Sequence, residues 1–309
     1  MLLDSSARGV YVISATPFTD TGELDLASLE ALTDFYLERG ATGLTVLGMM
    51  GEAPKLSPEE SAAVLETVLA RVAGRVPVVV GVSNPGMSAL VSLSQSAMAS
   101  GAAGVMIAPL ASLKTEEQVI NYFAAVCSAL GPDVPVVLQD FPLSTGVYIS
   151  VATIEAIAAK CPQIVMLKHE DWPGLSKLSR LRAGETGRGT RRLSVLVGNG
   201  GLFLPQELAR GADGAMTGYA YPEMLAEVCR LFDAGERERA EDLFDVHLPL
   251  IRHETQPGLG LAIRKEVLKR RGAIASAHVR APGPKLDGID QAELTGLMNR
   301  LEKRLQQLG

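Results

Sequence analysis

The chain has 309 residues, of which 47% are hydrophobic and 21% are charged. A chain of this size and hydrophobicity can bury a large core, which excludes an intrinsically disordered protein. The net charge is −6, whereas nucleic-acid-binding domains usually carry a basic excess, so we expect no nucleic-acid partner. Composition alone allows two domains, although α/β barrels often exceed about 250 residues as one unit.

Neither a signal peptide nor a membrane span is predicted, because no long apolar run follows a basic start at the N-terminus. The uncharged stretch Val76–Leu113 is interrupted by Asn84, Pro85 and Gln95 and leaves no apolar run of membrane length. We therefore expect a cytoplasmic protein without a membrane partner. The odd number of distant cysteines indicates buried free thiols in a reducing compartment: Cys127, Cys161 and Cys229.

The histidines do not have the spacing of metal ligands, so we expect no metal, and no other cofactor is predicted. The four of them are His169, His247, His253 and His278.

Eight short β-rich runs alternate with helical stretches along the chain. The predicted strands are apolar on both faces, as in a parallel sheet that is covered on both sides. They are Val10–Ala15, Gly43–Leu47, Val76–Val82, Gly104–Ala108, Val134–Gln139, Ile164–Lys168, Leu193–Val197 and Gly214–Thr217.

The predicted helices begin with capping chemistry and several end in glycine. Ser57 and Thr115 each precede an acidic first turn, which is typical of a helix start. The helices that alternate with the strands are expected at Leu26–Arg39, Pro58–Val72, Met87–Ser100, Glu116–Leu130, Val151–Ala159, Leu175–Arg182, Leu202–Arg210 and Pro222–Phe232. Glycine after several of them permits the left-handed conformation that closes a helix: Gly40, Gly101 and Gly211.

Eight consecutive β-α units without an inserted domain favour an α/β fold of the (β/α)8 TIM-barrel type. An open doubly wound sheet is the alternative, but the run Gly198-Asn199-Gly200-Gly201 lacks the spacing of a dinucleotide-binding loop. We assign residues 1–234 to the barrel and 235–309 to a C-terminal helical extension packed on it. Its helices are predicted near Glu236–Arg252, Leu259–Arg271 and Gln291–Leu305.

In such a barrel the functional groups lie at the carboxyl ends of the strands. Lys168 ends an apolar run there, and a dehydrated lysine has a lowered pKa and acts as a nucleophile toward carbonyl carbon. The alternative is a lysine that reaches solvent or pairs with Glu170 or Asp171. Both interpretations fit the residues alone.

The segment Gly48-Met49-Met50-Gly51 follows the second predicted strand. Backbone N–H groups in a glycine-bounded loop can bind a carboxylate, although an ordinary tight turn has the same composition. Lys55 nearby is either a surface charge or a second cation for an acidic substrate. Other strand ends contribute further candidates for the substrate site: Thr16, Gly198 and Tyr219.

Four motifs in order resemble one known family. They are Thr16-Pro17-Phe18, Gly48-x-x-Gly51-Glu52, Pro142-x-x-Thr145-Gly146 and Lys168. The chain resembles, over nearly its whole length, the dihydrodipicolinate synthase / N-acetylneuraminate lyase family of Schiff-base enzymes. The resemblance implies a barrel with a helical C-terminal extension, assembled as a homo-oligomer, either a dimer or a tetramer. It also implies a 2-oxo acid such as pyruvate, held as an imine on Lys168 with its carboxylate at the glycine-bounded loop.

The sequence departs from that family at its proton relay. Met49 and Met50 replace hydroxyl residues of the loop, and Gln139 stands where the family has a catalytic tyrosine. Ser144 stands where dihydrodipicolinate synthases proper have an arginine for the second substrate. Authentic dihydrodipicolinate synthase activity is therefore not expected.

We predict that Asp140 replaces the tyrosine as acid or base, because it leaves a strand end and could face Lys168. A capping or salt-bridging role for Asp140 is the alternative. Glu170 is the next candidate, since side chains alternate along a strand and Glu170 would point inward with Lys168 while His169 points away. Tyr219 or Tyr221 could supply a phenol, and Gln139 could hydrogen-bond an imine or a substrate oxygen.

The predicted function is a Schiff-base lyase, either an aldolase or a dehydratase, that acts on a 2-oxo acid or a 3-deoxy-2-oxo sugar acid. Carbon–carbon cleavage and dehydration begin from the same imine, so the residues do not separate them. The alternative is a barrel that binds a keto acid with little or no turnover, because Met49, Met50 and Gln139 replace the usual relay.

Overall fold

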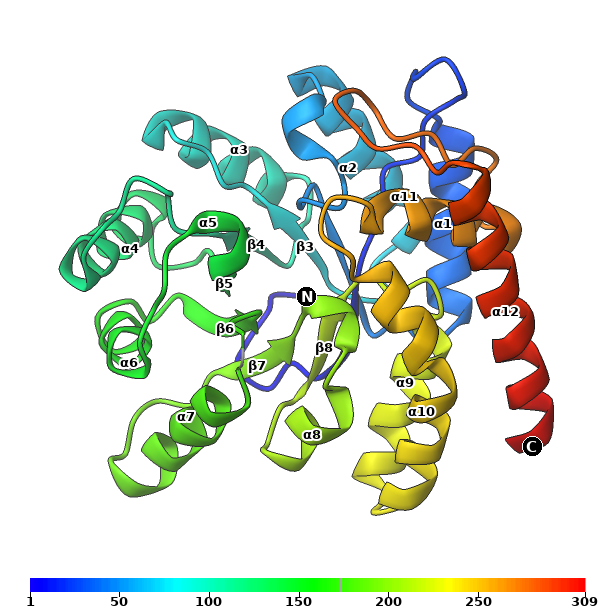
Figure 1. Cartoon of the computed structure of the whole chain (residues 1–309). Coiled ribbons are helices and arrows are strands. Elements are labelled where there is room, and N and C mark those ends of the chain that lie inside the picture. Colours follow the sequence, from blue (N-terminus) through cyan, green and yellow to red (C-terminus); the bar gives the residue numbers. More distant parts are fainter. Residues whose placement is uncertain (173, 309) are drawn as a thin grey trace.

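The computed structural model describes residues 1–172 and 174–308. Eight parallel strands pair in chain order, and β8 closes on β1 to form a barrel (Figure 1). This confirms the predicted (β/α)8 fold, and each predicted strand lies within two residues of its observed bounds. The strands are β1 Gly9–Ile13, β2 Gly43–Val46, β3 Val78–Gly81, β4 Gly104–Ile107, β5 Val136–Asp140, β6 Ile164–His169, β7 Ser194–Val197 and β8 Gly214–Thr217.

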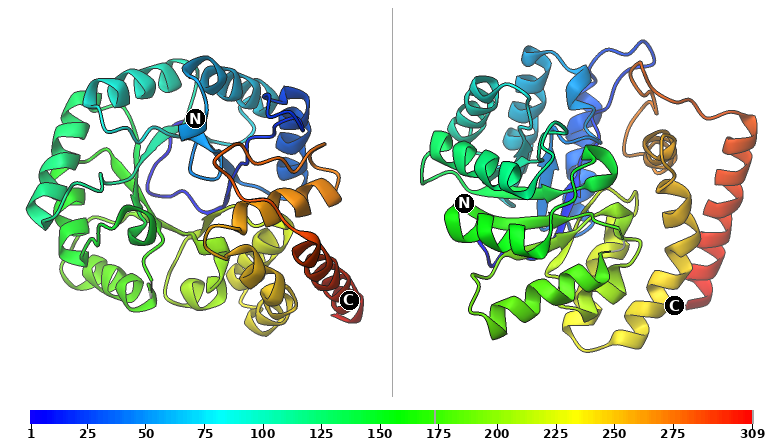
Figure 2. Two further views of the ribbon diagram at one scale, coloured as in Figure 1. Left: turned by 45° about the horizontal axis from the view of Figure 1, so that its top comes forward. Right: turned by 60° about the vertical axis from the view of Figure 1, so that its left-hand side comes forward.

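Helices surround this barrel and cover its outer face (Figure 2, left). They are α1 Leu26–Glu38, α2 Pro58–Val72, α3 Met87–Ala99, α4 Glu116–Leu130, α6 Val151–Lys160, α7 Leu175–Gly187, α8 Leu204–Ala209 and α9 Pro222–Asp233. All of them were predicted, although α7 extends five residues further than expected. Three short elements were not predicted: η1 Ala53–Lys55, α5 Pro142–Thr145 and η2 Asn199–Gly201.

The helix boundaries have the predicted local causes. Ser57 and Thr115 form capping boxes at the starts of α2 and α4, in which each side chain accepts from a backbone N–H three residues later. Gly40, Gly101 and Gly211 have positive φ angles, which a residue with a Cβ adopts only at a cost in free energy.

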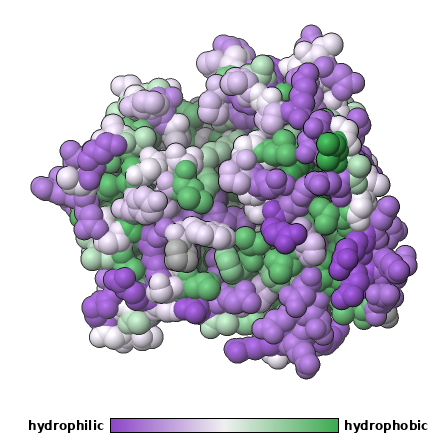
Figure 3. Space-filling model, viewed as in Figure 1, coloured by the Kyte–Doolittle hydropathy of each residue, from purple (hydrophilic) through white to green (hydrophobic). Residues whose placement is uncertain are grey.

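The three tail helices are α10 Arg237–Glu254, α11 Gly260–Arg270 and α12 Gly288–Leu308. α10 packs on α9, and α12 lies against α10 outside the ring of helices (Figure 2). Hydrophilic side chains gather over this outer part at the lower right of Figure 3, whereas hydrophobic ones reach the surface nearer the centre of that face. Among the described residues, none of the helices combines the length and apolar character needed to cross a bilayer.

The buried side chains form two layers because neighbouring residues of a strand point to opposite faces. The larger layer fills the space between strands and helices. The smaller layer fills the barrel and consists of Leu3, Tyr11, Ile13, Val79, Ala103, Met106, Val137, Met166, Leu196 and Met216. This second set tells us which face of each strand points inward, and therefore which polar residues can enter the site.

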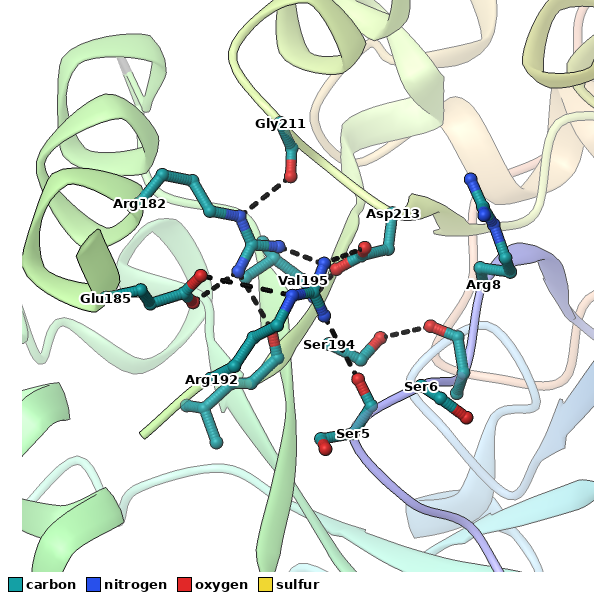
Figure 4. Close-up of polar contacts among 12 residues, drawn as sticks. Ser5, Ser6, Arg8, Arg182, Glu185, Arg192, Ser194, Val195, Gly211 and Asp213 are labelled. Carbon is teal, nitrogen blue, oxygen red and sulfur yellow. Dashed lines mark hydrogen bonds and ion pairs between the residues drawn. The ribbon is translucent and has the colours of Figure 1, made fainter. Parts of the chain in front are cut away.

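A cluster of charged side chains joins the segments that precede β7 and β8 (Figure 4). Asp213 accepts from the backbone N–H of Val195 at 2.8 Å and from Arg182 at 2.6 Å, and it also pairs with Arg192. The side chains of Arg182 and Asp213 are 15% and 12% exposed, so their charges are largely withdrawn from water. The cluster fixes these two turns relative to each other.

We predict that Asp213→Ala destabilises the fold by about 2 kcal/mol, because it removes a carboxylate that serves two arginines and a backbone donor. Urea unfolding monitored by circular dichroism measures this loss. Asp233→Ala is the matched control, since the Asp233–Arg8 pair is 60% and 64% exposed and should contribute less than about 1 kcal/mol. Equal losses in the two variants would contradict the prediction.

Candidate active site

Lys168 lies near the carboxyl end of β6 and points into the barrel. Met166, two residues earlier on the same strand, belongs to the interior layer, so Lys168 and Glu170 share its direction. The Lys168 Nζ is 3.0 Å from the Glu170 Oε2, and the two side chains are only 7% and 8% exposed. The structure thus brings together an amine and a carboxylate inside the barrel.

Gln139 completes this group from the neighbouring strand. It is paired in register with Lys168, and its Nε2 donates a 2.8 Å hydrogen bond to the same Glu170 Oε2. The glutamine therefore contacts the carboxylate rather than the lysine. Since the amide side chain is neither an acid nor a base near neutral pH, Gln139 can orient Glu170 but cannot relay a proton.

Gly198, directly after β7, leaves space for the side chain of Glu170. A Cβ built on Gly198 would overlap the side chain of Glu170, so only glycine lets the carboxylate approach this closely. The backbone carbonyl of Glu170 accepts a 3.2 Å hydrogen bond from the Asn199 side chain. Gly198 therefore shapes the site through Glu170.

Asp140 does not face Lys168, which corrects the prediction that it replaces the family tyrosine. It neighbours the inward Gln139 on β5 and so points outward, where its Oδ2 pairs with the Lys177 Nζ of α7 at 2.6 Å. The His169 Nδ1 lies 3.5 Å from the same oxygen. Asp140 is fully buried behind the strands, so the salt-bridging alternative describes its position.

His169 also points outward, as the alternation of β6 requires. Burial opposes the charged ring, but the Asp140 carboxylate and the Gly174 carbonyl, which lies 3.1 Å from Nε2, outweigh it and raise the pKa of His169 above 6.5. An imidazole and a carboxylate therefore lie side by side on the outer side of the strand that carries Lys168.

Tyr219 is also misplaced by the sequence prediction. It is fully buried behind β8, where its hydroxyl lies 2.9 Å from the His247 Nδ1 of α10. Tyr219 follows the inward-facing Gly218, so alternation turns its ring toward the helices. It therefore cannot line the substrate site, and its phenol is not an acid for the barrel interior.

The glycine-bounded loop after β2 has the free donors expected of a carboxylate site. In the described part of the chain, the backbone N–H groups of Met49 and Met50 donate to no protein acceptor. The Thr16 hydroxyl donates to the Gly51 carbonyl at 2.7 Å, which uses Thr16 to hold the loop. Gly48 lies over the interior residues Ile13 and Met106.

A buried ion network fixes the end of this loop. Glu52 has a left-handed backbone conformation, and its two oxygens pair with Lys265 of α11 at 2.5 Å and Lys55 at 2.9 Å. Lys55 therefore serves the loop as an internal partner. Burial lowers the pKa of Lys265, although Glu52 opposes this shift. The tail of the chain thus sets the shape of a loop more than 200 residues earlier.

Sequence reasoning missed several residues that complete this site. Lys177 and Lys265 supply buried counter-charges from helices, and their positions carry no local motif. Thr45 follows the inward direction of β2, and its buried hydroxyl has no partner among residues 1–172 and 174–308. Assigning alternate residues of β2 to the inner and outer faces would have identified Thr45 as an inward-pointing residue.

Comparison with known proteins identifies the family of this chain. Residues 6–301 match the Dihydrodipicolinate synthetase family. The chain belongs to this family. It is 32% identical to L-2-keto-3-deoxyarabonate dehydratase of Azospirillum brasilense over 300 residues, covering 96% of this chain and 94% of the other. The predicted enzyme class, a lyase, is thereby confirmed.

Solved structures of the dihydrodipicolinate synthetase family have the same fold. A dihydrodipicolinate synthase from Rhodopseudomonas palustris is 49% identical with a TM-score of 0.95, covering 97% of this chain and 99% of that one. YagE from E. coli K12, a family member solved in complex with pyruvate, is 27% identical with a TM-score of 0.86. That comparison covers 96% of this chain and 98% of YagE.

The raised pKa of His169 predicts a pH-dependent stability. The contribution of a charged His169 is complete below its unfolded pKa of about 6.5 and disappears as the pH rises through the higher folded value. We expect His169→Asn to flatten the fall in unfolding free energy above pH 6.5, as measured by urea unfolding at several pH values.

His253→Gln is the control for this measurement, because the His253 ring meets Gln256 rather than a carboxylate. It should keep the slope of the unaltered protein. An unchanged slope in His169→Asn would contradict the assigned pairing with Asp140.

Proposed function

We propose that this protein is a Schiff-base lyase that acts on a 2-oxo acid through an imine on Lys168. The observation that carries the proposal is the buried contact between Lys168 and Glu170, with Gln139 on the same carboxylate oxygen. An amine and a carboxylate at 3.0 Å form a nucleophile with an adjacent base. The pyruvate complex named for YagE supports a 2-oxo acid as the ligand.

In the proposed reaction, Glu170 takes a proton from Lys168, and the uncharged amine attacks the C2 carbonyl. Glu170 then returns the proton to the carbinolamine oxygen, which leaves as water to give an iminium ion. The iminium draws electrons from C3, so a C3 proton becomes acidic enough for Glu170 to accept. The resulting enamine can use its electrons to form a double bond between C3 and C4. Gln139 holds the carboxylate in position during this transfer.

Dehydration is the specific outcome that we propose, with a 3-deoxy-2-oxo sugar acid as substrate. The enamine expels the C4 hydroxyl, which takes the proton from Glu170 and leaves as water. Hydrolysis of the remaining iminium restores Lys168. The similarity to L-2-keto-3-deoxyarabonate dehydratase supports this outcome, and so does Ser144 in place of the arginine of synthases proper. Aldol cleavage would instead break the C3–C4 bond and release pyruvate.

Borohydride reduction in the presence of pyruvate tests the imine. We expect a mass adduct on the peptide that contains Lys168 and none in Lys168→Arg, because the guanidinium is not nucleophilic. Lys160→Arg is the control, since Lys160 is exposed at the end of α6 and should leave the adduct unchanged. The absence of an adduct with a broad panel of 2-oxo acids would refute the proposal.

Glu170→Gln should lower kcat by about 10²- to 10⁴-fold, the usual contribution of a general base, while the imine can still be trapped. Mass spectrometry of products from a 3-deoxy-2-oxo pentonate measures turnover and distinguishes loss of water from release of pyruvate. Glu293→Gln on the exposed face of α12 is the matched control. Unchanged kcat in Glu170→Gln would remove Glu170 from the mechanism.

The same assay separates catalysis from the alternative role. A trapped imine without any product over hours would favour a keto-acid-binding barrel with little turnover. The homo-oligomer that the family resemblance implies stays a prediction, as does the cytoplasmic location.

A further inference from the structure

Arg264 of α11 is a buried arginine with an incomplete set of partners among residues 1–172 and 174–308. Its side chain is 8% exposed, and its Nε donates a 2.9 Å hydrogen bond to the Glu254 Oε2 at the end of α10. Its Nη1 instead contacts the Met50 Sδ. A thioether is a weak acceptor, so this charged donor points at a group that hardly satisfies it. The ion pair with Glu254 explains the burial of Nε but not the direction of Nη1.

Met50 separates this guanidinium from the interior of the barrel. The side chain packs against the interior layer, and its sulfur occupies the space that a Cβ on Gly218 would need. Methionine is unbranched and adapts its shape easily, so Met50 can change rotamer at low cost. Arg264 is therefore only one adaptable side chain away from the loop whose N–H groups are free.

The charges inside the barrel do not by themselves attract an anionic substrate. Lys168 and Glu170 compensate each other at 3.0 Å, so this pair offers little net attraction to an anionic substrate. The loop offers the N–H groups of Met49 and Met50, while its two methionine side chains have no hydroxyl to add. With Nε on Glu254, the guanidinium still offers its two Nη groups as charged donors to a carboxylate.

We propose that Arg264 binds the carboxylate of the 2-oxo acid, together with the backbone N–H groups of Met49 and Met50. This inference rests on the proposed function, because it concerns the substrate of the Lys168 imine. It makes the C-terminal extension part of the substrate site. The neighbouring Lys265 holds the same loop through Glu52, so α11 (orange in Figure 1) contacts the loop at two consecutive residues.

The test compares an acid with its neutral ester, since a carboxylate-binding residue affects only the acid. Borohydride trapping on Lys168 is measured against the concentration of pyruvate and of methyl pyruvate. We expect Arg264→Gln to raise the half-saturating concentration of pyruvate by about 10- to 100-fold, the effect of a lost charge-assisted hydrogen bond. The value for methyl pyruvate should change less than about two-fold, because the ester carries no charge to bind.

Two further variants exclude a purely structural effect. Arg270→Gln, at the exposed end of the same helix, should leave both values unchanged. Arg264→Lys keeps the charge without the fork and should give an intermediate preference for the acid. It also provides the test if Arg264→Gln fails to fold.

Two results would overturn the inference while leaving the proposed function intact. One is an equal shift for pyruvate and methyl pyruvate, which indicates that Arg264 only supports the fold. The other is an unchanged preference for the acid in both Arg264 variants. If the unaltered protein forms no adduct with either compound, the proposed function fails and this inference fails with it.

Discussion

Closure of eight parallel strands into a barrel is the constraint on which the site depends, because it turns every second side chain toward a common axis. On β5 and β6 this alternation sends Gln139, Lys168 and Glu170 inward. It sends their sequence neighbours Asp140 and His169 outward, toward α7. A shift of one residue in either strand would exchange inward and outward residues, and in β6 it would remove Lys168 from the interior.

The alternation creates two buried charge networks on opposite sides of the same strands. Inside, Lys168 and Glu170 form a buried ion pair at the proposed site of imine formation. Outside, Asp140 of β5 pairs with Lys177 of α7. The burial of the Asp140 carboxylate would cost free energy without this partner. The outer network links β5 to α7, and the inner one contains the groups proposed for proton transfer. The Lys168–Glu170 pair and the Asp140–Lys177 pair thus lie on opposite faces of the same two strands.

The C-terminal extension shapes the site from the other side. Lys265 fixes Glu52, and Arg264 reaches Met50, so the loop between β2 and α2 takes its form from a helix near the end of the chain. This dependence gives the tail a structural role beyond covering the barrel. It also shows how a methionine-containing loop can keep a cation nearby when its side chains offer no hydroxyl groups.

The sequence by itself determined the barrel, since eight apolar runs, the caps at Ser57 and Thr115 and the closing glycines are local signals that tertiary contacts reinforce. It also identified Lys168 and the glycine-bounded loop, which lie next to such signals. Only the tertiary structure decided which carboxylate accompanies the lysine. Asp140 and Glu170 both lie at the carboxyl ends of neighbouring strands. Asp140 is one residue after the inward Gln139, and Glu170 is two residues after the inward Lys168, so the two carboxylates point to opposite faces. Likewise Tyr219 faces the helices and Arg264 reaches the loop because of packing between segments far apart in the chain, which no local pattern encodes.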